Sequence, residues 1–166
     1  YTNDILLNSL KIKKNIKAGV MINAGDLIKN KNKPLNELKK LFPKINKKIN
    51  FVRFACHHEE IFHIKDCITW LLSKKIEVFV NIMQISEIEE KAIKKICFFL
   101  QPVKIKALYI ADSLGSLNNK SFLKVANKFK KFWSGELGLH AHDNLRLALS
   151  NSLLATKSGF KWIDST

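Results

Sequence analysis

Two of the chain's five histidines, His140 and His142, stand one residue apart at the end of the apolar segment LGLHAH. If this segment is a β-strand, residues two apart point to the same face of the sheet, so the two imidazoles project side by side. Neutral imidazoles are common ligands of divalent cations. The spacing therefore predicts that His140 and His142 bind a metal ion. The alternative is a hydrogen-bonded pair that only shapes the surface.

A repeating pattern of elements positions these side chains. Asp143 and Asn144 follow the histidines as residue types that favour a helix N-cap, and apolar residues then recur at helical spacing. Five strand-like segments are each followed by a helical pattern of this kind, and a sixth segment begins near the end. The six segments are 18–24, 50–56, 76–83, 107–113, 136–142 and 161–164.

The segments are apolar on both faces, as buried parallel strands are, and they start roughly 25–30 residues apart, the length of one βα unit. This alternation predicts an α/β fold, either a doubly wound sheet or a (β/α)8 barrel. The chain contains neither G-x-G-x-x-G nor G-x-x-x-x-G-K after a strand, which disfavours a nucleotide-binding site.

Polar residues gather where these segments end. In α/β folds the carboxyl ends of parallel strands form the functional face of the sheet. We therefore expect the functional site at this edge. The residues concerned are Asn23, His57, His58, Asn81, Gln84, Asp112, Ser113, His140, His142, Asp164 and Ser165.

Five stretches together resemble the HMG-CoA lyase-like group of metal-dependent TIM barrels, the DRE-TIM metallolyase superfamily. They are GLHAHDNLRLALSNSLLA, LYIADSLGSL, VNIMQIS, VRFACHHEE and WIDST. The resemblance is nearest to the 4-hydroxy-2-oxovalerate aldolase-like branch and runs from about residue 16 to the end. It implies a partial (β/α)8 TIM barrel, in which the six segments are strands three to eight of a single domain over residues 1–166.

The resemblance also implies what this sequence lacks. Strands one and two, with the Arg-Asp pair that defines the superfamily, and a glycine-rich segment after WIDST are not in it. In the family that Asp is the carboxylate metal ligand, that Arg stabilises the enolate, and the aldolase branch draws its catalytic base from the same missing part. Both ends of the sequence look like cuts, so we expect a fragment that is catalytically incomplete by itself.

The activity implied by the resemblance is that of a divalent-metal-dependent carbon–carbon lyase. It would cleave a hydroxy-2-oxo acid to a pyruvate-like enolate and an aldehyde, or form the same bond in reverse. Two imidazoles and a carboxylate suit Mn²⁺, Mg²⁺, Zn²⁺ or Fe²⁺, and ligand type alone does not choose among them. The resemblance favours Mn²⁺ or Mg²⁺ over Zn²⁺.

Further residues receive predicted roles. Asp112 is predicted to be catalytic, by orienting a metal ligand or a bound water, with a turn-forming role as the alternative. Arg53, a charge inside an apolar strand, is predicted to pair with a carboxylate or to hold that of the substrate. Asn144, Asn81 and His57 are candidate substrate-binding residues, and N-capping a helix is the alternative for Asn144.

The charge distribution and the positions of the cysteines limit the binding partners and the cellular compartment that we expect. The net charge of +15, from 29 Lys and Arg against 14 Asp and Glu, is spread over nearly every segment, as on solvated helix faces, so we expect no nucleic-acid partner. No apolar run is long enough to span a membrane. Cys56, Cys67 and Cys97 lie in apolar stretches and are predicted to be buried thiols of a cytoplasmic protein. The oligomeric state stays open, with a homo-oligomer as one alternative.

Two other functions stay open. One is a Claisen-type acyl-CoA transferase or synthase of the same superfamily, similar to isopropylmalate and homocitrate synthases. The other is a non-catalytic basic binding protein, which predicts salt-dependent retention on nucleic acid and no metal site at His140.

Overall fold

One parallel β-sheet organises the chain in a computed structural model that describes residues 4–29 and 33–164. The six strands lie side by side in chain order, and each strand end falls within one residue of the predicted segment. They are β1 (Ala18–Asn23), β2 (Ile49–Cys56), β3 (Glu77–Ile82), β4 (Ala107–Asp112), β5 (Leu137–Ala141) and β6 (Trp162–Ile163).

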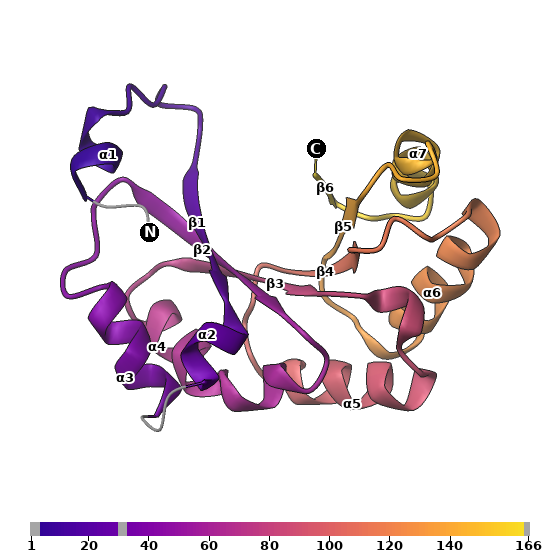
Figure 1. Ribbon diagram of the computed structural model, residues 1–166, viewed down its shortest axis with the longest axis horizontal. Coiled ribbons are helices and arrows are strands. Elements are labelled where there is room, and N and C mark those ends of the chain that lie inside the picture. The colour runs from indigo at the N-terminus through magenta and orange to yellow at the C-terminus, as the bar shows by residue number, and fades with distance from the viewer. Residues whose placement is uncertain (1–3, 30–32, 165–166) are drawn as a thin grey trace.

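Helices follow the strands and cover one side of the sheet. Figure 1 shows the sheet curving, with helices α2 to α6 along its outer side and α7 beside β5 and β6. The helices are α1 (Asp4–Ser9), α2 (Ala24–Ile28), α3 (Pro34–Leu41), α4 (Lys65–Ser73), α5 (Glu90–Leu100), α6 (Asn119–Phe132) and α7 (Ala148–Lys157). Two 3₁₀ turns, η1 (Glu60–His63) and η2 (Ile85–Glu87), precede α4 and α5. None of the described helices has the length and apolar character needed to cross a membrane.

The two faces of the sheet bury different side chains. Alternate residues such as Val52, Val80 and Ile110 belong to the large hydrophobic core under the helices. The residues between them form a smaller aromatic cluster on the concave face, where Phe79 packs edge-on against Trp162 with ring centroids 5.1 Å apart. Both faces are therefore buried along the central strands, which is why these segments are apolar at nearly every position.

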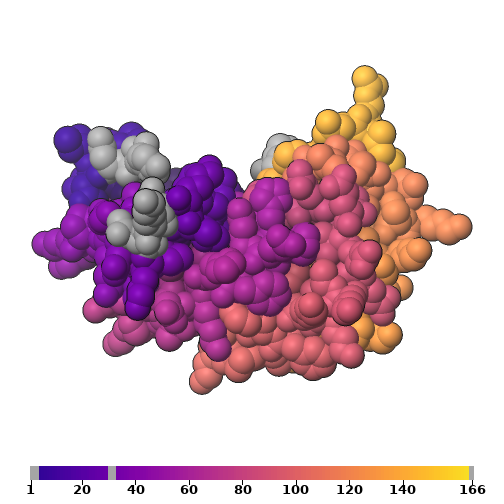
Figure 2. Space-filling view, turned by 60° about the horizontal axis from the view of Figure 1, so that its bottom comes forward, coloured from indigo at the N-terminus to yellow at the C-terminus, as the bar shows by residue number. Residues whose placement is uncertain are grey.

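The sheet is open within the described residues. The order runs from β1 to β6 and each strand pairs only with its neighbours in that order, so β1 and β6 are edges. Figure 2 shows the same arrangement as a surface, with N-terminal elements in indigo and C-terminal elements in yellow at opposite ends of the molecule.

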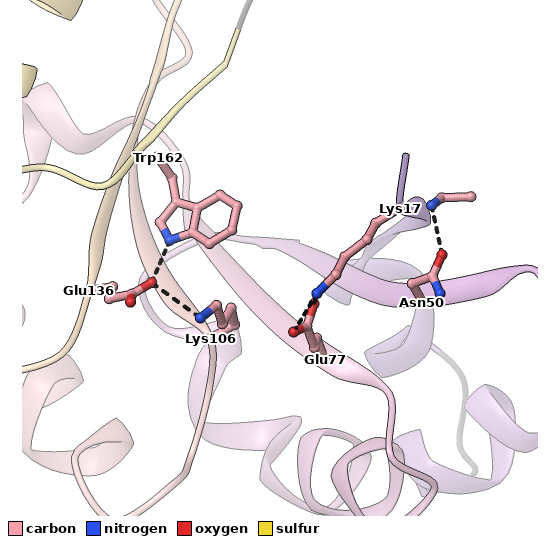
Figure 3. A network of polar contacts seen from close by, with 7 residues as sticks. Lys17, Asn50, Glu77, Lys106, Glu136 and Trp162 are labelled. Atoms are coloured by element: carbon pink, nitrogen blue, oxygen red, sulfur yellow. Dashed lines mark hydrogen bonds and ion pairs between the residues drawn. The ribbon is translucent and has the colours of Figure 1, made fainter. Parts of the chain in front are cut away.

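Ion pairs join the strands at their amino ends, as Figure 3 shows. Lys17, just before β1, pairs with Glu77 at 2.7 Å. Glu136, just before β5, accepts a hydrogen bond of 2.6 Å from the Trp162 indole and lies 3.6 Å from the Lys106 ammonium. Exposed pairs of this kind each contribute about 0–1 kcal/mol. The candidate site lies at the other, carboxyl ends of the strands.

Candidate metal centre

The two predicted histidines lie side by side at the carboxyl end of β5. His140 is the fourth residue of this five-residue strand, and His142 follows its last residue. Their Nε2 atoms are 3.1 Å apart, and their ring centroids are separated by 5.0 Å. His142 is exposed, whereas the side chain of His140 is 21% exposed. The predicted juxtaposition is confirmed, and the role of the two residues as ligands stays a prediction.

The separation of the two Nε2 atoms fits a shared ion. Two imidazole nitrogens that each bind one cation at about 2.1 Å must lie roughly 3–4 Å apart, because the angle at the ion is near 90–110°. The 3.1 Å observed is within this range. Within the ranges 4–29 and 33–164, no group of three or more His, Cys, Asp or Glu side chains is arranged to hold a metal ion. These residues therefore supply two donors, and the remaining positions would fall to water, substrate or other protein groups.

Asp164 and Arg53 lie behind His140. The Nδ1 atom of His140 is 2.8 Å from Oδ2 of Asp164, and the same oxygen accepts a hydrogen bond of 2.5 Å from Nη1 of Arg53. Arg53 belongs to β2, whereas Asp164 directly follows β6, so the Arg53 side chain reaches across the concave face, where its guanidinium lies near Phe79 of β3 and Tyr109 of β4. Its carbon Cζ lies 4.2 Å from the ring centroid of Tyr109. The prediction that Arg53 pairs with a carboxylate is confirmed, and contact with a substrate stays a prediction.

The surroundings of Asp164 and Tyr109 set their charge. Burial alone would raise the pKa of Asp164, but hydrogen bonds from His140 and Arg53 and the Arg53 charge outweigh it, so this pKa is lowered. Burial also raises the pKa of Tyr109 to about 12, against the opposing influence of the Arg53 charge. At neutral pH the cluster therefore contains an ionised carboxylate and a neutral phenol.

A glycine makes room for this cluster. Gly138 on β5 pairs in register with Tyr109 on β4. A Cβ atom at Gly138 would lie 2.6 Å from the Tyr109 ring, closer than real contacts allow. The absence of a side chain at this position lets the ring approach β5 closely, in the position where it contacts the guanidinium of Arg53.

Asp112 holds a turn. Its two carboxylate oxygens accept hydrogen bonds of 3.0 Å from the backbone N–H groups of Ser116 and Leu117, and the residue is 2% exposed. Gly115 supplies the left-handed conformation of this turn, with φ at +58°. The structure thus supports the turn-forming alternative, and a catalytic role for Asp112 stays a prediction.

Asn81 lies on the concave face in register with Tyr109 and is 3% exposed. Its Oδ1 atom has no hydrogen-bond partner among the described residues. His57 lies exposed just beyond β2, and its backbone N–H donates to the Glu60 carboxylate at 2.8 Å. For both residues, substrate binding stays a prediction.

The start of α7 differs from the expected N-cap. The helix begins at Ala148, its N-cap is Leu147, and Asn144 is exposed in the preceding loop beside Gly115. The prediction that Asn144 N-caps this helix is therefore wrong. Asp143 does bind the helix end, since its side chain accepts a hydrogen bond of 2.9 Å from the Ala148 N–H. The loop between Asp143 and Ala148 contains Arg146 in a left-handed backbone conformation, with φ at +56°. The spacing of apolar residues in the sequence does not reveal such a conformation.

Comparison with known proteins places this arrangement in a family. A family model described as HMGL-like matches residues 44–166. The chain belongs to the HMGL-like family. The 4-hydroxy-2-oxovalerate aldolase 2 of Nocardia farcinica is 24% identical to it over 118 residues, which are 71% of this chain and 34% of that protein. The homocitrate synthase of a Frankia species is 25% identical over 103 residues, or 62% of this chain and 26% of that protein.

Solved structures support the fold. The HMG-CoA lyase of Bacillus subtilis superposes with a TM-score of 0.76 at 14% identity, covering 97% of this chain and 57% of that one. The predicted fold class, a partial TIM barrel, is thereby confirmed. This HMGL-like chain spans about a third of the length of the Nocardia aldolase that it matches.

Sequence reasoning assigned no role to two residues of this HMGL-like site, Tyr109 and Asp164. Asp164 was noted only as a polar residue at a strand end. The sequence does contain a signal for Asp164. Trp162 pairs with Gly138, and Asp164 and His140 each lie two residues further along the chain, so the two side chains are expected on the same face of the sheet. Tyr109 is marked only by being the one hydroxyl-bearing residue in the apolar segment ALYIA.

Proposed function

We propose that this HMGL-like chain is part of a divalent-metal-dependent carbon–carbon lyase that acts on a hydroxy-2-oxo acid. The products would be a pyruvate-like enolate and an aldehyde, and the reverse reaction would form the same bond. The observation that carries the proposal is the pair of Nε2 atoms of His140 and His142, 3.1 Å apart at the carboxyl edge of the sheet. The match to the HMGL-like family and to an aldolase supports it.

The residues fit a divalent cation, for which Mn²⁺ or Mg²⁺ is our choice over Zn²⁺. When bound, such a cation supplies a Lewis acid for the oxygens of a 2-oxo acid and stabilises the negative charge that develops on bond cleavage. The two imidazoles would hold it from the β5 side.

The other residues of the concave face would bind and orient the substrate. Asn81 presents a buried Oδ1 atom without a partner in the described chain, and an unsatisfied acceptor of this kind costs about 1–3 kcal/mol. A substrate hydroxyl that donates to it would remove this cost. Arg53 is already bound to Asp164, so its contribution would be to hold that carboxylate in place, more than to bind a substrate directly.

The proposal is tested first by metal binding. Mn²⁺ is titrated into the whole product of the gene, and free Mn²⁺ is followed by EPR for the wild type, the His142→Ala variant and the control His63→Ala, which changes an exposed histidine of η1. We expect one saturable site in the wild type and the control, and none in His142→Ala. A folded wild type that leaves all Mn²⁺ free, or equal binding by His142→Ala, would contradict the metal-dependent function.

A Claisen-type condensing activity is the second candidate, because a homocitrate synthase is among the matched relatives. The two candidates differ in their co-substrate. The aldolase would release pyruvate from 4-hydroxy-2-oxovalerate without coenzyme A, as measured by lactate dehydrogenase and NADH. The synthase would release free coenzyme A thiol only when acetyl-CoA and a 2-oxo acid are both present. These assays use the whole product of the gene.

A further inference from the structure

We propose that Asp164 is a positioning residue that fixes the tautomer and ring orientation of His140, and so directs the Nε2 lone pair of His140 toward His142. The part of this inference that concerns a metal ion rests on the proposed function. The part that concerns the imidazole does not.

The hydrogen-bond chemistry of the contact defines the tautomer. An ionised carboxylate can only accept hydrogen bonds, so the 2.8 Å contact places the proton on Nδ1 of His140. A neutral ring with Nδ1 protonated has a lone pair on Nε2. That atom lies 3.1 Å from Nε2 of His142, the position from which both rings can bind one ion. A hydrogen bond on the far nitrogen of this kind sets ring orientation and ligand strength in metal sites.

Asp164 is itself held by two contacts besides the one with His140. Arg53 donates to the same carboxylate oxygen that contacts His140, and both side chains of this ion pair are only 15% exposed. The guanidinium lies over the Tyr109 ring, so it cannot easily swing away. The backbone N–H of Asp164 donates to the carbonyl of Leu139 at 3.0 Å, which fixes the main chain beside His140.

A purely structural ion pair would not require this geometry. An Asp164 that only neutralised Arg53 could do so without contacting His140. Instead, the oxygen that accepts from the guanidinium also lies at hydrogen-bond distance from the imidazole. One oxygen accepts from both partners, and this arrangement transmits the fixed position of the guanidinium to the ring of His140.

The test is the tautomer of His140 in the metal-free 166-residue chain, read from the ¹⁵N shifts of histidine labelled with ¹⁵N, at a pH where imidazoles are neutral. We expect a protonated Nδ1 and an unprotonated Nε2 in the wild type. Asp164→Ala should lose this signature, whereas Asp164→Asn, which keeps an acceptor oxygen, should retain it. The control is Glu136→Gln, which alters an ion pair at the amino ends of the strands and should leave His140 unchanged.

Folding is controlled by a second variant. Asp164→Ala leaves Arg53 buried without its partner, so this variant can unfold. The double variant Arg53→Met with Asp164→Leu removes both charges and should fold, again without the Nδ1–H signature. A wild type whose His140 carries its proton on Nε2, or a folded variant without an acceptor that keeps the Nδ1–H form, would overturn the inference.

Metal affinity separates the two proposals. In the whole product of the gene, loss of the Asp164 carboxylate should weaken Mn²⁺ binding about 10–100-fold, the cost seen when such supporting partners are removed from metal sites. A wild type that has the Nδ1–H tautomer but binds no Mn²⁺ would overturn the metal-dependent function and still support the role of Asp164. Mn²⁺ binding that is equal in the wild type and the variants lacking the acceptor would overturn the positioning role and leave the proposed function intact.

Discussion

At the scale of single residues, the ion pair between Arg53 and Asp164 links the site to the stability of the sheet. Both side chains are 15% exposed, so solvent screens their interaction only in part. Removing the carboxylate charge leaves the guanidinium without its ionised partner. Hydrogen bonds to charged groups contribute about 1.5–3 kcal/mol each.

We therefore expect Asp164→Asn to lower the free energy of unfolding by about 1.5–3 kcal/mol at pH 7. The pKa of Asp164 is lowered in the folded state, so its stabilising effect is fully present above its unfolded pKa of about 3.9 and is lost as the pH falls through the folded pKa. The difference between wild type and variant should thus shrink under acid conditions. Urea unfolding at a series of pH values measures it. A difference that is constant with pH would show that the Asp164 charge is not the cause.

At the scale of elements, the strands were predictable and the details between them were not. Each strand segment is apolar at nearly every position because helices cover one face and an aromatic cluster fills the other. The side-by-side histidines followed from strand parity alone. The partner of His140 did not, because Asp164 lies 24 residues further along the chain and only the pairing of β5 with β6 brings the two together. Asn144 failed as an N-cap because the loop before α7 is longer than the apolar pattern indicated.

The close packing of β4 against β5 gives a prediction at this scale. Gly138→Ala would place a methyl group 2.6 Å from the Tyr109 ring, so the ring and the guanidinium over it must move. Overpacking of this kind typically costs about 1–3 kcal/mol, and we expect this loss in the free energy of unfolding.

A double-mutant cycle checks the cause. In a Tyr109→Leu background, the same Gly138→Ala change should cost less, because the smaller side chain leaves space for the methyl group. Equal costs in the two backgrounds would mean that the backbone of β5, and not the Tyr109 ring, requires glycine.

At the scale of the whole molecule, apolar side chains are exposed where the sheet is open. Leu149 and Leu153 lie one helical turn apart on α7 and are 74% and 56% exposed. Met21 on the edge strand β1 is 58% exposed, and Ile163 on the other edge is 39% exposed. Exposed apolar surface and unpaired strand edges favour association. The net charge of +15 opposes it by repulsion between copies of the chain.

These opposing effects predict a dependence on salt. Salt screens the repulsion, since the Debye length falls from about 10 Å at 0.1 M to about 3 Å at 1 M, but it does not weaken contacts between apolar side chains. The 166-residue chain should therefore shift from monomer toward larger species as salt rises, as measured by light scattering after gel filtration. Replacing Leu149 and Leu153 with Glu should suppress the shift, whereas Phe98→Ser, which changes an apolar residue on the outer helix α5, should not. The alternative function, a basic protein that binds nucleic acid, predicts the opposite dependence on salt, because its association with nucleic acid weakens as salt rises. Association that falls as salt rises, in a preparation that contains nucleic acid, would thus favour the binding-protein alternative over association through exposed apolar side chains.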